Sequence, residues 1–109
     1  MLFRSSFKLE RNRLIEISSI LLSRMDRAKN LINFIFVDDP KERYWYHIAI
    51  KYYDLSSTFL LEISQMLEED KESYLISKEH LEKLVNYQKQ LDNIENLFSQ
   101  SNKFSIKLN

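Results

Sequence analysis

The chain contains no glycine, and its single proline is Pro40. Tight turns between β-strands depend on Gly, Asn-Gly and Pro, because these residues supply the backbone angles that such turns require. A chain with so little turn chemistry is expected to form few and long elements. The sequence therefore predicts helices, and its 109 residues correspond to about one domain, 1–109.

Composition removes several classes of function. Without cysteine the chain forms no disulfide, thiolate metal site or cysteine nucleophile. Without glycine it has no phosphate-binding loop or dinucleotide fingerprint. Sixteen basic and sixteen acidic side chains give no net charge, so no global field attracts nucleic acid or an anionic membrane. We expect a cytoplasmic protein with no cofactor, no metal and no transmembrane segment.

The first helix is predicted over residues 6–37. Its apolar residues recur every three or four positions, which is the spacing of one face of a helix. A single stripe of this length predicts one continuous helix, roughly 45 Å long. The stripe consists of Leu14, Ile17, Leu21, Met25, Ala28, Ile32 and Ile35.

The second helix is predicted over residues 40–67. Asp39 is expected to cap it, Pro40 fits its first position, and Glu42 stands where the second residue of a capping box belongs. The polar residues 68–73 are expected to end it. Its core stripe consists of Trp45, Ile48, Tyr52, Leu55, Phe59, Ile63 and Met66.

The third helix is predicted over residues 78–101, with a C-terminal tail at 102–109. Ser77 is the expected cap, and Ile76 and Leu81 occupy the two positions of a hydrophobic staple. The core stripe consists of Leu81, Leu84, Leu91, Ile94 and Phe98. Because short connections make sequential helices antiparallel neighbours, we predict an all-α, up-down bundle of three long helices. A break in the first helix would give four, and a second chain is a further way to complete the bundle.

The second helix is apolar over more of its circumference than one core stripe requires. A second apolar series lies beside the first with the same spacing, and the first helix ends in a segment that is apolar nearly all round. One interpretation is a wide core with half-wet tyrosines at its edge. The other is a surface for a second protein chain, because aromatic residues at helical spacing are typical contact anchors. That interface would consist of Phe34, Phe36, Tyr44, Tyr46, Ile50, Tyr53, Leu60 and Leu61.

Catalytic apparatus is sparse in this sequence. His47 and Asp54 share the polar strip of the second helix, but no nucleophile is placed beside them. His80 follows the Ser77 cap and fits a helix-start residue. Neither histidine has the spacing of a metal-ligand pair. We therefore predict a protein that is not an enzyme, and keep catalysis at His47 as an alternative.

Five of the six arginines lie in the first 27 residues. This asymmetry is the best argument for nucleic-acid binding, which would use Arg13, Arg24 and Arg27. These three arginines flank one side of the apolar stripe, however, where long basic side chains cover the edge of a core. From the same positions the basic first helix can pair with the acidic third.

We predict that the chain is a non-enzymatic interaction module. A small regulator, adaptor or inhibitor that binds another protein, itself as a homodimer, or both, fits the surplus of apolar helix surface. One alternative is a nucleic-acid-binding regulator that uses the first helix. The other is a membrane-surface or immunity-type helical protein.

Overall fold

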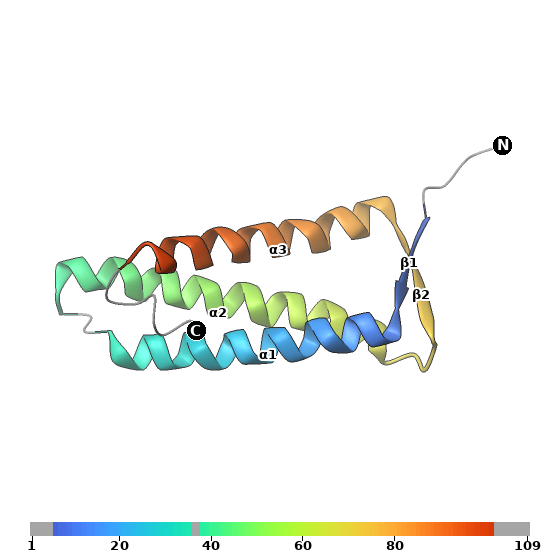
Figure 1. Ribbon diagram of the computed structural model, residues 1–109, viewed down its shortest axis with the longest axis horizontal. Helices are drawn as coiled ribbons and strands as arrows, with labels where there is room; N and C mark the ends of the chain where they lie inside the picture. Colours follow the sequence, from blue (N-terminus) through green and yellow to red (C-terminus); the bar gives the residue numbers. More distant parts are fainter. Residues whose placement is uncertain (1–5, 36–37, 102–109) are drawn as a thin grey trace.

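The computed structural model describes residues 6–35 and 38–101 (Figure 1). Three helices of 24, 28 and 22 residues account for most of them, so the prediction of a mostly helical chain is confirmed. Two short strands form a small sheet, which the all-α prediction did not include. In chain order the elements are strand β1 (Ser6–Glu10), helix α1 (Arg11–Phe34), helix α2 (Pro40–Leu67), strand β2 (Ser73–Ser77) and helix α3 (Lys78–Ser99).

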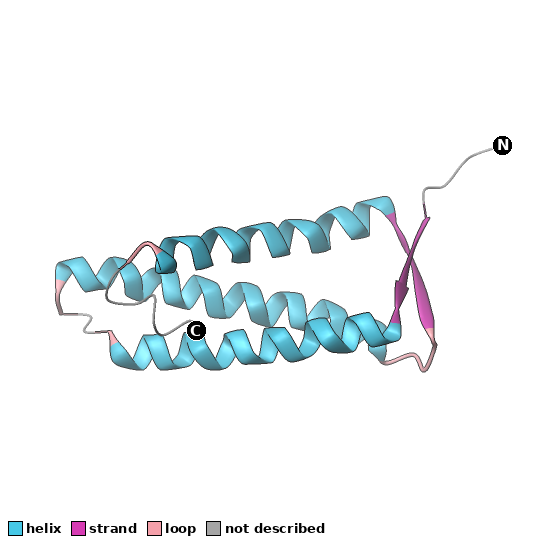
Figure 2. Cartoon of the chain, viewed as in Figure 1, coloured by secondary structure: helices cyan, strands magenta, loops and turns pink. Residues whose placement is uncertain are grey.

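The two strands pair antiparallel at one end of the helices (Figure 2). Phe7 lies opposite Ile76 and Leu9 opposite Tyr74, so these four side chains share one face of the ribbon, while Leu75 lies on the other face. No tight turn joins the strands, because α1 and α2 lie between them in the chain. The absence of glycine therefore did not prevent this pairing. The first helix begins after the ribbon, at residue 11 instead of the predicted residue 6.

The backbone N–H groups at the starts of the helices find hydrogen-bond acceptors in two ways. Asp39 Oδ1 accepts a hydrogen bond from the backbone N–H of Lys41 at 2.9 Å, and Ser77 Oγ accepts one from the backbone N–H of His80 at 3.1 Å. Both side-chain caps were predicted. Helix α1 has no side-chain cap. Instead the backbone N–H of Arg11 donates to the carbonyl of Glu72 at 2.8 Å, so the residue before β2 supplies the acceptor.

The predicted helix ends differ from the observed ones by a few residues. Helix α1 runs without a break to residue 34, so the four-helix alternative is not observed, and α3 ends at residue 99 instead of 101. Helix α2 has the predicted bounds. The interface residue Phe36 and the C-terminal tail 102–109 lie outside the described residues.

Successive helices lie side by side and run in opposite directions (Figure 1). The backbones of α1 and α2 approach closely, and α3 keeps a greater distance from both. Aromatic contacts attach α3 to α2: the ring centroids of Phe98 and Trp45 are 5.4 Å apart, and those of Tyr87 and Phe59 are 5.5 Å apart. The core therefore runs along α2, with α1 on one flank and α3 on the other.

Candidate functional site

An apolar groove lies between α1 and α3. Its volume is about 350 Å³, and Phe59 and Ile63 of α2 contribute to its lining from behind. The wall formed by α1 includes Ile17 and Ile20, which stand one turn apart. The groove is close to the sheet end of the molecule, where Leu9 of β1 also lines it. The wall formed by α3 consists of Leu81, Leu84, Val85 and Gln88.

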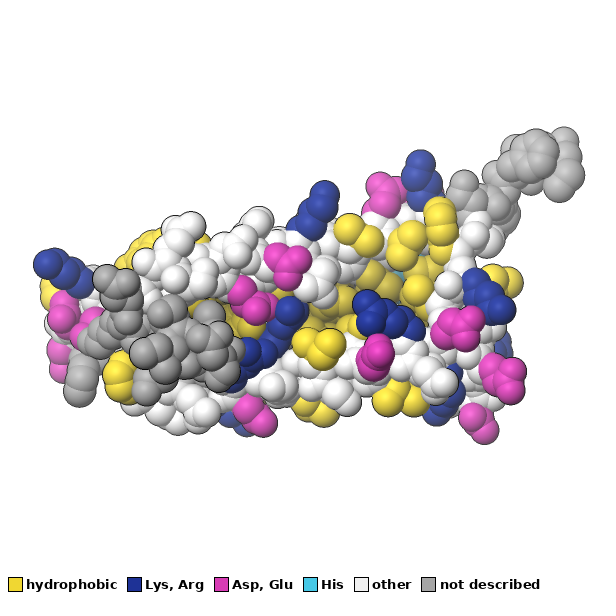
Figure 3. All heavy atoms as spheres, in the orientation of Figure 1, with side chains coloured by type: hydrophobic (Ala, Val, Ile, Leu, Met, Phe, Trp, Pro, Cys, Tyr) yellow, Lys and Arg dark blue, Asp and Glu magenta, His cyan; other side chains and the backbone are white. Residues whose placement is uncertain are grey.

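Two apolar side chains that line this groove remain accessible to solvent, while those at its base are buried. Ile20 is 45% exposed and Val85 is 46% exposed, although both are large hydrophobic residues. Figure 3 shows hydrophobic side chains along the space between α3 and α1, toward the β1–β2 end. Apolar pockets of a few hundred cubic ångströms are typical binding sites. The groove is therefore the strongest candidate for a functional site.

An ion pair bridges α1 and α3 at the groove. Arg24 Nη2 lies 2.8 Å from Glu95 Oε2 and 4.0 Å from Asp92 Oδ1. The side chain of Arg24, only 12% exposed, also lines the groove. The predicted pairing of the basic first helix with the acidic third is thus confirmed for Arg24. Such a pair fixes where α1 and α3 lie relative to each other.

The hydroxyl of Tyr52 lies beneath this ion pair. Tyr52 is fully buried in α2. Burial raises the pKa of the Tyr52 hydroxyl, and the carboxylate of Glu95 raises it further, while Arg24 and Arg27 lower it to a smaller extent. The hydroxyl therefore remains neutral throughout the physiological pH range.

Most of the interface residues predicted from the sequence lie away from the groove. Tyr44 is 53% exposed, Leu61 58% and Phe34 40%. The four other predicted interface residues that the structure describes are half-buried, and three of these four pack against the core. The ammonium group of Lys29 on α1 lies 5.8 Å from the ring centroid of Tyr53. The half-buried members are Tyr46, Ile50, Tyr53 and Leu60.

The groove itself was not predicted from the sequence. Leu14, Ile17, Leu81 and Leu84 were assigned to the core stripes, and Ile20 and Val85 belonged to no stripe. An isolated apolar residue beside a stripe is common on a helix and does not by itself indicate a site. The available signal was that α1 and α3 each carry such a residue, Ile20 and Val85.

The three arginines of the nucleic-acid hypothesis occupy different environments. Arg13 has an exposed side chain and pairs with Glu16, one turn along α1, at 3.1 Å. Arg24 is engaged by Glu95, and Arg27 is half-buried. A phosphate-binding face presents its cations to solvent. The structure therefore does not bring these arginines together on one exposed face.

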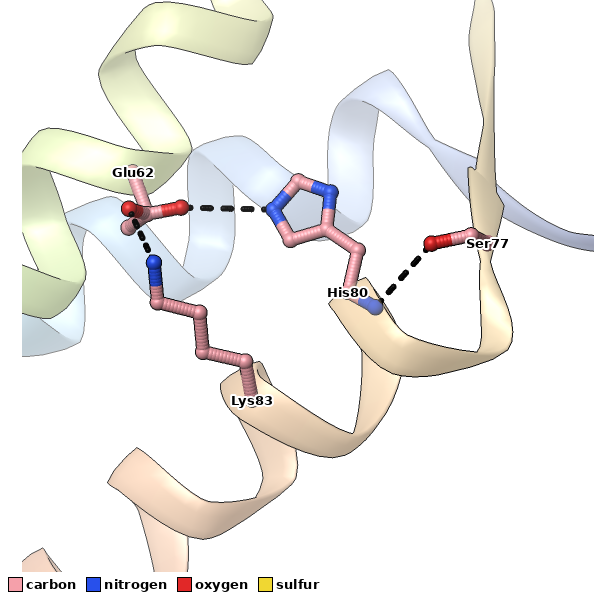
Figure 4. A network of polar contacts seen from close by, with 4 residues as sticks. All are labelled: Glu62, Ser77, His80 and Lys83. Carbon is pink, nitrogen blue, oxygen red and sulfur yellow. Dashed lines mark hydrogen bonds and ion pairs between the residues drawn. The ribbon is translucent and has the colours of Figure 1, made fainter.

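A second polar network joins α3 to α2 (Figure 4). His80 Nε2 lies 3.3 Å from Glu62 Oε1, and Lys83 Nζ donates to Glu62 Oε2 at 3.0 Å. The hydrogen bond from Lys83 lowers the pKa of the Glu62 carboxyl, and the same bond raises the pKa of Lys83. His47 and Asp54, the alternative catalytic pair, are both exposed on α2. The network links two helices, and the Ser77 hydroxyl beside it accepts from the backbone N–H of His80 as a helix cap.

The described residues contain neither a candidate metal site nor a candidate membrane span. No cluster of three or more His, Cys, Asp or Glu side chains with the spacing of a metal site occurs at 6–35 and 38–101. Within the same ranges, every helix is too short or too polar to cross a bilayer. Comparison of the chain with protein-family models, curated proteins and solved structures gives no match. The groove is therefore the feature of the structure from which we infer a function.

Proposed function

We propose that the chain is a protein-interaction module whose groove between α1 and α3 receives an amphipathic helix of another protein. The groove is the observation that carries this proposal. The three helices would form an up-down bundle, and the docked helix would occupy a fourth position beside α1 and α3. Helix-in-groove recognition works by burying apolar anchors of the incoming helix, spaced by three or four residues.

The dimensions of the groove suit such a helix. Its lining residues on α1 extend from Arg13 to Arg24, which at the rise of an α-helix is about 16 Å, or three turns. A helix of about ten to fifteen residues would cover that length. The accessible side chains Ile20 and Val85 stand on opposite walls, where an incoming apolar side chain would contact both.

A second copy of this chain is a poorer occupant. To fill the groove, a helix must present exposed apolar residues on successive turns of one face. Within the described ranges, the exposed large apolar side chains outside the groove do not form such a stripe: Ile15 and Leu22 share a face of α1 but stand two turns apart, and the others are scattered over four elements. They are Phe7 of β1, Ile15, Leu22 and Phe34 of α1, Tyr44 and Leu61 of α2, and Leu75 of β2.

Site-specific photo-crosslinking tests this proposal with a matched control. Ile20 and Ile15 are the same residue type on the same helix and are both 45% exposed, but only Ile20 lines the groove. A photoreactive residue placed at either position in the source organism would report what contacts each side of α1. We expect a crosslink from Ile20, and none from Ile15, to an amphipathic helical segment of another protein.

The crosslinked segment is then tested as a synthetic peptide on the purified protein. Ile20→Glu should weaken peptide binding about tenfold or more, because it places a charge at an anchor contact. Ile15→Glu should leave binding within about twofold. Crosslinks that arise equally from both positions, or from Ile20 to this chain alone, would overturn the proposal. The second of these results would indicate self-association instead.

A further inference from the structure

The two walls of the groove differ in charge. Among the described residues that line it, the charged ones are Arg13 and Arg24, and both belong to α1. The α3 wall is neutral, with Leu81, Leu84 and Val85 followed by the amide of Gln88. A helix docked in the groove would therefore meet guanidinium groups along the α1 edge only, and each of them already faces a carboxylate of this chain.

Arg13 can accept a new partner at little cost. Its side chain is 63% exposed, and its present partner, Glu16, is 61% exposed on the same helix. Exposed ion pairs of this kind contribute little to stability. A carboxylate arriving from a docked helix could share or replace Glu16 without opening the fold.

Arg24 has hydrogen-bonding capacity that α3 does not use. Its Nη2 faces Glu95, and Asp92 lies at 4.0 Å from the same nitrogen. Its Nε and Nη1 are buried, and across 6–35 and 38–101 no acceptor lies within hydrogen-bonding distance of either. Buried N–H groups of a guanidinium without an acceptor are unfavourable, so a turn of the Arg24 side chain that let these groups reach a carboxylate of the docked helix would be stabilising.

We propose that the helix received by this groove is acidic along the edge that meets α1. The proposal rests on the function proposed above and adds the chemistry of the partner. Arg13 and Arg24 stand eleven positions apart, or about three turns. The docked helix would thus carry carboxylates at two places about three turns apart, flanking its apolar stripe. Opposite charges at the rim of an interface favour fast and selective association.

Selection from a displayed library of helical peptides of about fifteen residues tests this directly. The apolar stripe and both flanking edges are randomised, and selection is carried out on three proteins: the natural chain, Arg13→Glu and Lys51→Glu. Lys51 is an exposed residue of α2 that does not line the groove, so its reversal changes the net charge equally. Arg13 is exposed enough for its variant to fold.

The expected result is a change of charge preference at one position. The natural chain and Lys51→Glu should enrich Asp or Glu along one edge, and Arg13→Glu should enrich Lys or Arg at the position facing residue 13. The best peptide of the natural chain should bind Arg13→Glu about three- to tenfold more weakly. Its binding to the natural chain should weaken as salt is added.

Failure of the acidic edge and failure of the proposed function would give different results. If the peptides carry no acidic preference, or keep it on Arg13→Glu, and Ile20→Glu still abolishes their binding, the acidic edge is wrong and the groove remains the docking site. If no helical peptide is enriched, or if binding is indifferent to Ile20→Glu, the proposed function is wrong and the acidic edge with it.

Discussion

Helix α1 lies close to α2 along one side and at a distance from α3 along the other. The buried faces of α1 and α2 contain small residues, Ala28, Ala49 and Ser56, each fully buried. Small side chains at a helix contact allow the two axes to come close together. Helix α3 contains no alanine, and it rests on α2 through stacked rings such as Tyr87 on Phe59.

This difference shows what sets the width of the groove. Periodicity decides which face of a helix is buried, whereas the size of the residues on that face decides how closely the neighbouring helix approaches. Bulky contacts between α3 and α2 keep α3 away from α1, and the apolar side chains of Ile20 and Val85 beside the space between α1 and α3 are then left about half exposed. The contact of α1 with α2 is a packed core, and the space between α1 and α3 is an apolar groove.

The largest expected effect comes from the contact that attaches α3. Phe98 is fully buried, and its ring lies against Trp45 and Tyr52 of α2. Phe98→Ala should lower the free energy of unfolding by about 3–5 kcal/mol, because it removes a large buried ring and leaves a cavity. Urea unfolding measures this value.

The control is Val85→Ala, on the groove side of α3. Val85 is half-exposed, so its truncation should change the free energy of unfolding by no more than about 0.5–1 kcal/mol. Equal losses for the two variants would mean that α3 is not held mainly by its aromatic contact with α2.

The next prediction compares a larger side chain at a buried position of α2 with a larger side chain beside the groove. Ala49→Leu adds volume at a fully buried position of α2, and should cost about 1–3 kcal/mol of unfolding free energy. Val85→Leu adds volume beside the open groove and should stay within about 0.5 kcal/mol. Thermal unfolding of both variants is the measurement. Tolerance of Ala49→Leu would indicate that α1 and α2 are not closely packed.

The smallest effect concerns the polar contact between α2 and α3. The pKa of Glu62 is lowered from its ordinary value of 4.5, first by the hydrogen bond from Lys83. A carboxyl whose pKa is lowered on folding stabilises the fold above its unfolded pKa and loses that contribution as pH falls through the folded pKa. Glu62→Gln should therefore flatten the decline of the melting temperature between neutral pH and about pH 3.

Lys83→Met supplies the matched variant for this pair. It removes the hydrogen bond that is the largest cause of the lowered pKa of Glu62, so it should flatten the same acid limb in part, and adding it to Glu62→Gln should change nothing further. The raised pKa of Lys83 has the opposite sign, because its contribution is present at lower pH and is lost as pH rises through the folded value. An acid limb unchanged in both single variants would contradict the assignment.

Much of the helical structure could be predicted from the sequence, because local signals determine it. Asp39 and Ser77 were predicted to be caps from their positions before apolar periodic segments, and both accept the expected backbone hydrogen bonds. The strands could not be predicted in this way. Phe7 and Ile76 are partners across the ribbon but lie far apart in the chain, and residues 6–10 were included in the predicted first helix although they alternate between polar and apolar as a strand does.

The candidate site was harder to predict because it depends on distances between helices. The wide apolar face of α2 suggested an interface at residues such as Tyr53, and much of that face packs beside α1 instead. Ile20 and Val85 indicate a site only once α1 and α3 are known to form opposite walls of one groove. Spacing along one helix carries no information about that separation.

The most direct test of the account is a methyl NMR titration of the protein with a helical peptide that binds it, whether crosslinked or selected. The isoleucine methyl groups of α1 report both sides of the helix, since Ile17 and Ile20 line the groove and Ile15 does not. The account predicts shifts at Ile17, Ile20 and Val85 with no change at Ile15. Shifts at Ile15 and Leu61, with the groove signals unmoved, would contradict it and place the binding surface on the other side of α1.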